Sequence, residues 1–342
     1  AKIEQELPRF IATVDNIYHL QRLSPELYAT IKDFVCRGGK RIRPMLFILG
    51  YLGFSKKKAR GLYTSALAIE LLHDFLLVHD DIIDRSDLRR NKPTAHKIFE
   101  SYLKKSRNAK CTGSDLAIIM GDIMYAIAIH AFLSIKEDQK LKESALRIFV
   151  NAAVFTGCGE FIELIYSMTP LDRLNPKKIH TIYDYKTSYY TFSCPLSSGA
   201  ILGGASKREY RILTEFGLLI GKAFQMKDDI LGMMSEEEAS GKSSLSDLQE
   251  AKKTLLIWHA YTNASPGQKQ KIKHLLSKQT ITRTDLLEMR SLIHDTGAVT
   301  RLEQEIRECV ARGEKILKTS GMKEPHKKEL VEYIRQLLDS LG

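Results

Sequence analysis

The sequence is poor in cysteine and lacks any paired cysteine motif. Five cysteines are spread over 342 residues, and no two of them form a C-x-x-C pair: Cys36, Cys111, Cys158, Cys194 and Cys309. An odd, scattered set argues against a disulfide framework and against a zinc site. The pattern is typical of a reducing compartment, so we expect a cytoplasmic protein.

An N-terminal targeting signal is also missing, because residues 1–9 are charged and have no apolar core. Residues 116–133 are apolar and long enough to imitate a membrane span. The run contains Asp122 and His130, however, and its flanks show no clear anchor pattern. We therefore predict a buried core helix here and no transmembrane segment.

Alternating strand patterns and tandem repeats are absent as well. Apolar residues instead recur at three- and four-residue spacing in residues 10–20, 61–78, 116–135, 141–154, 210–224 and 330–341. With 44% hydrophobic residues, the chain can bury a large core. The predicted fold class is all-α: a single large multi-helix domain over residues 1–342 around a central cavity.

The chain carries an excess of positive charge, with 52 Lys and Arg against 41 Asp and Glu, a net charge of +11. The basic clusters are isolated and have no interleaved aromatic residues, so we expect no nucleic-acid partner. Small anionic substrates and a weak membrane association both remain open.

The most informative stretch is Leu-Leu-His-Asp-Phe-Leu-Leu-Val-His-Asp-Asp-Ile-Ile-Asp, residues 71–84. Asp80 and Asp84 are four apart, so on a helix their carboxylates share a face, as does His73 seven residues earlier. Asp81 adds a third acid. A solvated acidic face explains such acids poorly among apolar neighbours, whereas a Mg²⁺ ion that also binds substrate phosphates explains them well.

A second acidic pair, Asp228 and Asp229, follows Phe224-Gln225 at the end of another apolar run. Two such pairs on separate helices suggest two walls of one cavity, although helix capping is an alternative. Asp122 lies inside the apolar run 116–133, so we expect it to be buried and to need a partner. That partner is either a local hydroxyl or the metal cluster.

Cationic segments accompany these acids. Lys40, Arg41 and Arg43 crowd the start of a predicted helix, after two glycines and before Pro44. Cations there favour a bound anion, the alternative being a solvated basic turn. Lys186-Thr187 offers a compact positive charge and a hydroxyl group, which suit a phosphate clamp. Residues 234–254 read as a loop that closes over a charged ligand.

Together these segments resemble the trans-isoprenyl diphosphate synthase (polyprenyl synthase) family. The matching motifs occur in the family's order and cover about residues 36–255: Gly38–Pro44, Asp80-Asp81-x-x-Asp84 with Arg89-Arg90, Lys186-Thr187, Phe224-Gln225-x-x-Asp228-Asp229, Gly241-Lys242 with Ser246-Asp247, and Lys252-Lys253-Thr254. The ordered set is far more specific than any single motif.

The resemblance implies an all-α homodimer that condenses isopentenyl diphosphate with an allylic diphosphate. It implies several Mg²⁺ ions held by Asp80, Asp84 and Asp228, with Asp81 and Asp229 in support. It places the allylic diphosphate on Arg89, Lys186, Thr187, Gln225, Lys242 and Lys252. It places isopentenyl diphosphate on Lys40, Arg43, His73 and Arg90.

The sequence departs from the family pattern at two positions. Asn91 stands where Gly is frequent, but Asn tolerates left-handed backbone geometry. Gly232 replaces a third Asp, so we expect weaker metal binding on that side. Two alternatives stay open: a terpene cyclase, and a non-catalytic subunit of a heteromeric synthase.

Product length is expected to depend on the apolar side of the helix that carries Asp80. One helical turn rises about 5.4 Å, close to one extended isoprene unit. Successive candidates for a floor are therefore Leu76, Phe75 and Leu72. An aromatic residue five before the first Asp resembles archaeal geranylgeranyl diphosphate synthases, so we expect a C20 product, with farnesyl diphosphate as intermediate or co-product. The alternative is that Phe75 only packs the core.

Overall fold

The structure, a computed structural model, describes residues 2–105, 108–234 and 248–340. Its elements are α1 Lys2–Tyr18, α2 Leu20–Leu23, α3 Pro25–Cys36, α4 Ile42–Phe54, α5 Leu62–Ile83, β1 Leu88–Arg89, β2 Lys92–Pro93, α6 Ala95–Leu103, α7 Gly113–Phe132, α8 Gln139–Ser167, the 3₁₀ turn η1 Leu171–Arg173, α9 Pro176–Ile182, the π-helix η2 Tyr183–Ser193, α10 Cys194–Leu202, α11 Lys207–Met234, α14 Leu255–Asn263, α15 Pro266–Ser277, α16 Arg283–Asp295, α17 Ala298–Lys318 and α18 Glu324–Asp339.

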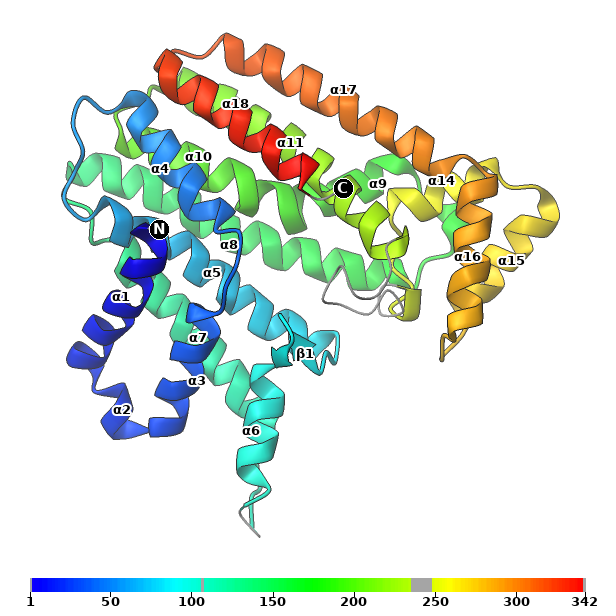
Figure 1. The fold of residues 1–342 in the computed structure, drawn as a ribbon, viewed down its shortest axis with the longest axis horizontal. Helices are drawn as coiled ribbons and strands as arrows, with labels where there is room; N and C mark the ends of the chain where they lie inside the picture. Colours follow the sequence, from blue (N-terminus) through cyan, green and yellow to red (C-terminus); the bar gives the residue numbers. More distant parts are fainter. Residues whose placement is uncertain (1, 106–107, 235–247, 341–342) are drawn as a thin grey trace.

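The predicted all-α fold is confirmed. Strand pairing in the described residues is limited to the two-residue antiparallel ladder of β1 and β2. Helices pack in pairs, α5 along α7, α10 along α4 and α11 along α17. In Figure 1, α1–α3 and α6 lie on one side of this assembly, α14–α16 at one end, and α17 and α18 along the opposite side. The long α5, α8 and α11 run through the middle and carry the acidic motifs.

Buried hydrophobic side chains gather in three clusters. One joins α1, α3, α4, α5, α7 and α8, a second joins the end of α11 to α14–α17, and a third joins α4, α10, α11, α17 and α18. Because α11 contributes to two of them, its acidic end is held between packed layers.

The helix predicted within residues 116–135 is α7, and it is less buried than expected. Side chains such as Met120 and Met124 lie in the core, whereas Ile119 is 56% exposed. By length and composition, α7 and α8 could each span a membrane, with 44% and 28% of their apolar windows buried. The prediction of no transmembrane segment therefore stays a prediction.

The expectation of a buried Asp122 is wrong. Its side chain is 70% exposed, and its Oδ1 lies 3.8 Å from His79 Nε2. Because α7 is apolar on most of its circumference, the sequence did not indicate which face would meet α5. The neighbouring Gly121 takes that place against the His79 ring.

A π-helix, not foreseen from the sequence, carries Lys186 and Thr187. Close approaches by two glycines bring it against its neighbours. A Cβ on Gly159 of α8 would lie 2.4 Å from Lys186 N, and one on Gly221 of α11 would lie 2.4 Å from Ser188 Cα. These contacts exclude any larger residue and set α8 and α11 directly beside the Lys186 segment.

Candidate active site

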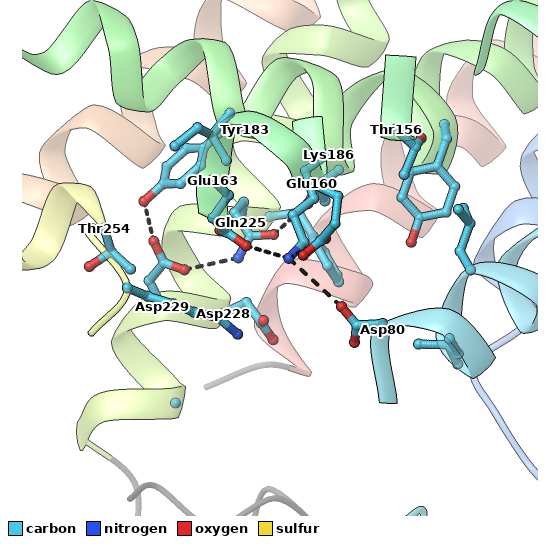
Figure 2. Close-up of a pocket in the computed structure, with 18 of the residues that line it drawn as sticks. Asp80, Thr156, Glu160, Glu163, Tyr183, Lys186, Gln225, Asp228, Asp229 and Thr254 are labelled. Atoms are coloured by element: carbon cyan, nitrogen blue, oxygen red, sulfur yellow. Dashed lines mark hydrogen bonds and ion pairs between the residues drawn. The ribbon is translucent and has the colours of Figure 1, made fainter. Parts of the chain in front are cut away.

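A cavity of about 1090 Å³ lies among α5, α8, η2 and α11. Its polar lining includes Asp80 of α5, Glu160 of α8, Lys186 of η2 and Asp228 of α11 (Figure 2). The structure thus brings both predicted acidic pairs to one cavity, although about 150 residues separate them in the sequence.

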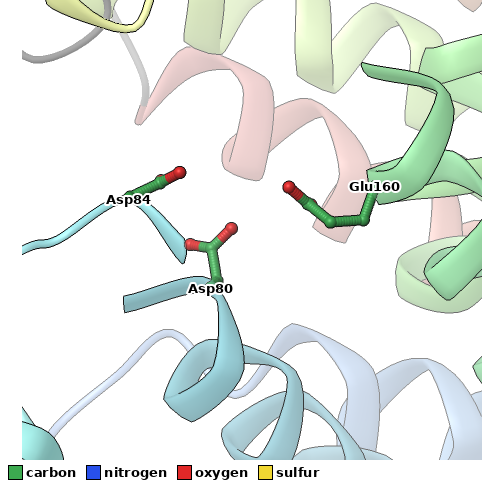
Figure 3. A group of neighbouring side chains, drawn as sticks. All are labelled: Asp80, Asp84 and Glu160. Carbon is green, nitrogen blue, oxygen red and sulfur yellow. The ribbon is translucent and has the colours of Figure 1, made fainter. Parts of the chain in front are cut away.

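Three carboxylates form a group that fits a divalent cation. Asp80, Asp84 and Glu160 each offer an oxygen, and these atoms lie within 4.8 Å of one another (Figure 3). Asp80 and Asp84 come from the end of α5, one helical turn apart, while Glu160 reaches in from α8. Carboxylate oxygens are the ligands that Mg²⁺ prefers in proteins.

Lys186 joins the walls of the cavity. Its Nζ lies 2.7 Å from Glu160, 3.7 Å from Asp80 and in hydrogen-bond contact with Glu163. Burial disfavours the ammonium ion, but the three carboxylates outweigh this effect and raise the pKa of Lys186 above its usual value. Lys186 is therefore a permanent cation inside an acidic cavity.

Arg89 compensates two of the motif's acids. Its guanidinium donates to Asp80 Oδ2 at 3.1 Å and to Asp81 Oδ1 at 2.8 Å. Burial opposes the charged form, yet Asp81 and Asp80 raise the pKa of Arg89. Asp81 itself is 1% exposed. Its observed contact is thus to Arg89, which it orients toward the cavity.

The second wall is a chain of hydrogen bonds that orients Gln225. Thr187 Oγ1 donates to Gln225 Oε1 at 2.7 Å, and Gln225 Nε2 donates to Asp229 Oδ1 at 2.9 Å. The other oxygen of Asp229 accepts from the Tyr183 hydroxyl. Asp228 is exposed to the cavity beside this chain.

Arg43 and His73 meet at Tyr190, a residue the sequence analysis missed. Arg43 Nη2 donates to Tyr190 Oη and Thr191 Oγ1, both at 2.9 Å, and Tyr190 Oη lies 3.3 Å from His73 Nδ1. Burial and the nearby Arg43 hold the pKa of His73 well below its usual value, so its imidazole is neutral. Lys40 lines the cavity and its Nζ donates to Ser340 Oγ, just after α18, at 3.1 Å.

The basic residues before α4 do not all serve the anion site that the sequence predicts. Arg41, in the left-handed region with φ 48°, forms an ion pair with the half-exposed Glu4 at 2.7 Å and one with the buried Glu70 at 2.8 Å. Its charge is therefore balanced within the protein, not by a bound anion. Arg90 lies over Gly39 and donates to Arg37 O at 3.2 Å.

Both residues of the turn between β1 and β2, Arg90 and Asn91, have positive φ, 56° and 58°. The expectation that Asn91 accepts left-handed geometry is confirmed. Gly232 lines the cavity at the end of α11. The motif's missing third carboxylate would have occupied this place.

The lysines after α11 are partly described. Lys252 Nζ lies 3.8 Å from Asp84 and 2.6 Å from Glu250, and Lys253 lines the same cavity. Burial lowers the pKa of Lys253 to about 8. Of the closing loop predicted over residues 234–254, residues 235–247, which include Lys242, lie outside the described residues.

The cavity has an apolar part next to its acids. Phe75 and Leu76 line it, whereas Leu72 is fully buried in the core and is not among the described residues that line the cavity. The Phe75 ring contacts His79 at 4.8 Å and Tyr125 at 5.2 Å, centroid to centroid. Of the three floor candidates, two are thus in reach of a bound chain.

Glu160 and Glu163 are the main site residues that sequence reasoning missed. They stand three apart in residues 157–164, an otherwise uncharged stretch of α8. Acids at helical spacing among apolar neighbours were the signal that drew attention to Asp80 and Asp84, and the same signal is present here.

The comparisons agree with this geometry. The family model described as polyprenyl synthetase matches residues 24–293. A geranylgeranyl diphosphate synthase of Sulfolobus acidocaldarius is 30% identical, covering 79% of this chain and 77% of the relative. A geranylfarnesyl diphosphate synthase of Aeropyrum pernix is 30% identical, covering 87% and 88%.

The fold has a counterpart among solved structures. A crystal structure of geranylgeranyl pyrophosphate synthase from Corynebacterium glutamicum, complexed with isoprenyl diphosphate and magnesium, matches 99% of both chains with a TM-score of 0.89 at 24% identity. The expected resemblance is confirmed: this chain belongs to the polyprenyl synthetase family and is a prenyltransferase.

Proposed function

We propose that residues 1–342 form one isoprenyl diphosphate synthase domain, which condenses isopentenyl diphosphate with allylic diphosphates, head to tail. The main product is geranylgeranyl diphosphate, with farnesyl diphosphate as intermediate or co-product. The observation that carries the proposal is a single cavity with acids on two walls, cations between them and an apolar end. Relatives named geranylgeranyl and geranylfarnesyl diphosphate synthase support it.

The metal ligands in this proposal are Asp80, Asp84 and Asp228, with Asp81 and Asp229 in support. Glu160 joins Asp80 and Asp84, because their oxygens already lie within 4.8 Å of one another. Several Mg²⁺ ions would bind here and offset negative charge on a leaving diphosphate. Gly232 stands in place of a third Asp at the end of α11, so the weaker Mg²⁺ binding that we expect from it concerns only the ligands on α11.

The allylic diphosphate is assigned to Arg89, Lys186, Thr187, Gln225 and Lys252, with Lys242 in the undescribed segment. Isopentenyl diphosphate is assigned to Lys40, Arg43, His73 and Arg90. The described cavity lining includes Tyr190 but neither His73 nor Arg90. In this proposal His73 therefore acts through its contact with the Tyr190 hydroxyl.

The chain's residues favour ionisation of the allylic substrate. Its C–O bond breaks, and the electron pair leaves with the diphosphate, which Lys186 and Arg89 meet with fixed positive charge. The double bond of isopentenyl diphosphate then attacks the allylic cation, and a proton passes to the departed diphosphate. Phe75 and Leu76 keep water from the cation.

The test is to incubate the purified chain with Mg²⁺, isopentenyl diphosphate and primers of C5, C10 and C15, followed by chromatography of the products. We expect C20 diphosphate and loss of activity with a chelator. A hydrocarbon formed without isopentenyl diphosphate would indicate a cyclase. Activity only after a second subunit is added would indicate a non-catalytic partner.

The homodimer is proposed as well. Large apolar side chains are exposed on α7 and α8, among them Ile119 (56%) and Val154 (56%). A second copy would bury them. Light scattering should give twice the mass of the chain, and Val154→Glu should shift the protein toward monomer. A monomeric wild-type chain at assay concentration would contradict this.

A further inference from the structure

Asp74 is an acid for which the residue roles assigned above give no explanation. Its side chain is fully buried, and neither carboxylate oxygen has a hydrogen-bond partner among the described residues. It lies on α5, directly after His73 and one turn before Val78. An ionised carboxyl in such a place would cost several kcal/mol unless charge compensates it.

The carboxyl one turn earlier on the same face is Glu70, and it is buried too, at 1% exposed. Glu70 takes Arg41 as its ion partner at 2.8 Å, and Arg41 is shared with Glu4. Two buried carboxyls that compete for one guanidinium do not both ionise readily. Burial, followed by the charge of Glu70, raises the pKa of Asp74 well above its usual value.

The other charged or titratable groups around Asp74 come from four elements. Arg43 projects from α4 and Arg90 from the β1–β2 turn. Cys36 of α3 lies close enough for its thiol to sense Asp74. From α1, Glu4 reaches this region through Arg41.

Arg43 and Arg90 are the cations in this group without a carboxylate partner in the described structure. Arg43 donates to Tyr190 and Thr191, and Arg90 donates to a backbone carbonyl. Their charges are available to a diphosphate as long as Asp74 is neutral. An ionised Asp74 would cancel one of the two.

We propose that Asp74 controls the affinity of the isopentenyl diphosphate pocket: the neutral acid leaves Arg43 and Arg90 free for the diphosphate, and its ionisation weakens binding. This inference rests on the proposed function. It adds a residue whose role is to set the net charge of that pocket, without contact to the substrate.

The test is the pH dependence of KM for isopentenyl diphosphate in the wild type and in Asp74→Asn. Burial raises the pKa of Asp74 well above its usual value, so KM is measured from mildly acidic to alkaline pH, over the range in which the enzyme stays folded. We expect the wild-type KM to rise about tenfold across it. In Asp74→Asn, which keeps size and loses charge, KM should change less than about twofold.

Two comparisons separate this effect from general pH effects. Asp295→Asn removes an exposed acid at the end of α16 and should follow the wild-type profile. The KM for the allylic primer should have the same pH profile in all three proteins. Parallel profiles for isopentenyl diphosphate in wild type and Asp74→Asn would overturn the proposal, as would a KM raised at every pH by the substitution.

The proposal can also be tested without a variant. Binding of a diphosphate favours neutral Asp74, so the wild type should take up protons when it binds isopentenyl diphosphate at the alkaline end of the range. Calorimetry in two buffers of different ionisation enthalpy measures this uptake, and its absence would contradict the role of Asp74. Failure of the wild type to form any prenyl product would instead refute the proposed function.

Discussion

Removing the Phe75 ring should lengthen the product by one isoprene unit. Phe75 lines the apolar part of the cavity, and the next ring behind it is Tyr125, 5.2 Å away between centroids. That distance is close to one helical turn of about 5.4 Å, which is about the length of one extended isoprene unit. Phe75→Ala should therefore shift the main product from C20 to C25.

The structure also predicts a second step. Behind Tyr125 the next ring is that of Phe149, at 6.4 Å and nearly parallel to it. Phe75→Ala with Tyr125→Ala should thus add a further unit and give C30. Tyr125→Ala alone should leave the product at C20, because the Phe75 ring still blocks the growing prenyl chain before it reaches position 125.

The assay is product analysis by chain length with a C15 primer and excess isopentenyl diphosphate. Leu72→Ala is the matched control on the same helix. Since Leu72 is fully buried, this change should lower the melting temperature, at a cost of about 2–5 kcal/mol, without altering the product. An unchanged product in a folded, active Phe75→Ala protein would refute Phe75 as the floor.

Four other changes test the site. We expect about a thousandfold lower kcat in both Asp80→Ala and Asp228→Ala, with the helical circular dichroism unchanged. Near wild-type turnover of either variant at saturating Mg²⁺ would refute the metal assignment. Arg43→Ala should raise KM for isopentenyl diphosphate about tenfold and more than that for the primer, and an equal effect on both would show misplaced pockets. Lys253 loses its charge above about pH 8, so Lys253→Arg should move the alkaline decline of kcat/KM to higher pH. Superimposable pH profiles of the variant and the wild type would show that the charge of Lys253 does not cause this decline. Turnover should also depend on Mg²⁺ with an order above one at fixed substrate.

The sequence was informative where a local pattern determines structure. The four-residue spacing in residues 80–84 placed Asp80 and Asp84 together, and apolar periodicity located the long helices. The resemblance to the family then implied that Asp228 would face Asp80. The first two inferences required no knowledge of tertiary packing, whereas the third came from the resemblance.

Packing decided what the sequence left open. Arg41 and Arg43 stand two apart in one basic turn, yet one is balanced by Glu4 and Glu70 while the other donates to neutral hydroxyls. The partners of Arg41 lie 37 and 29 residues away. A local pattern therefore could not assign the two roles.

The higher-order dependence on Mg²⁺ follows from the two places where the described part of the cavity offers acids. Asp80, Asp84 and Glu160 each offer an oxygen within 4.8 Å of one another. Asp228 lies on another helix, α11, and lines the same cavity. A Mg²⁺ ion usually takes one or two carboxylates and keeps water and substrate phosphate as its other ligands. One ion would therefore bind at the first group and a further ion between Asp228 and the diphosphate, so turnover should need more than one ion. A strictly first-order dependence on Mg²⁺ down to concentrations well below saturation would refute this reasoning.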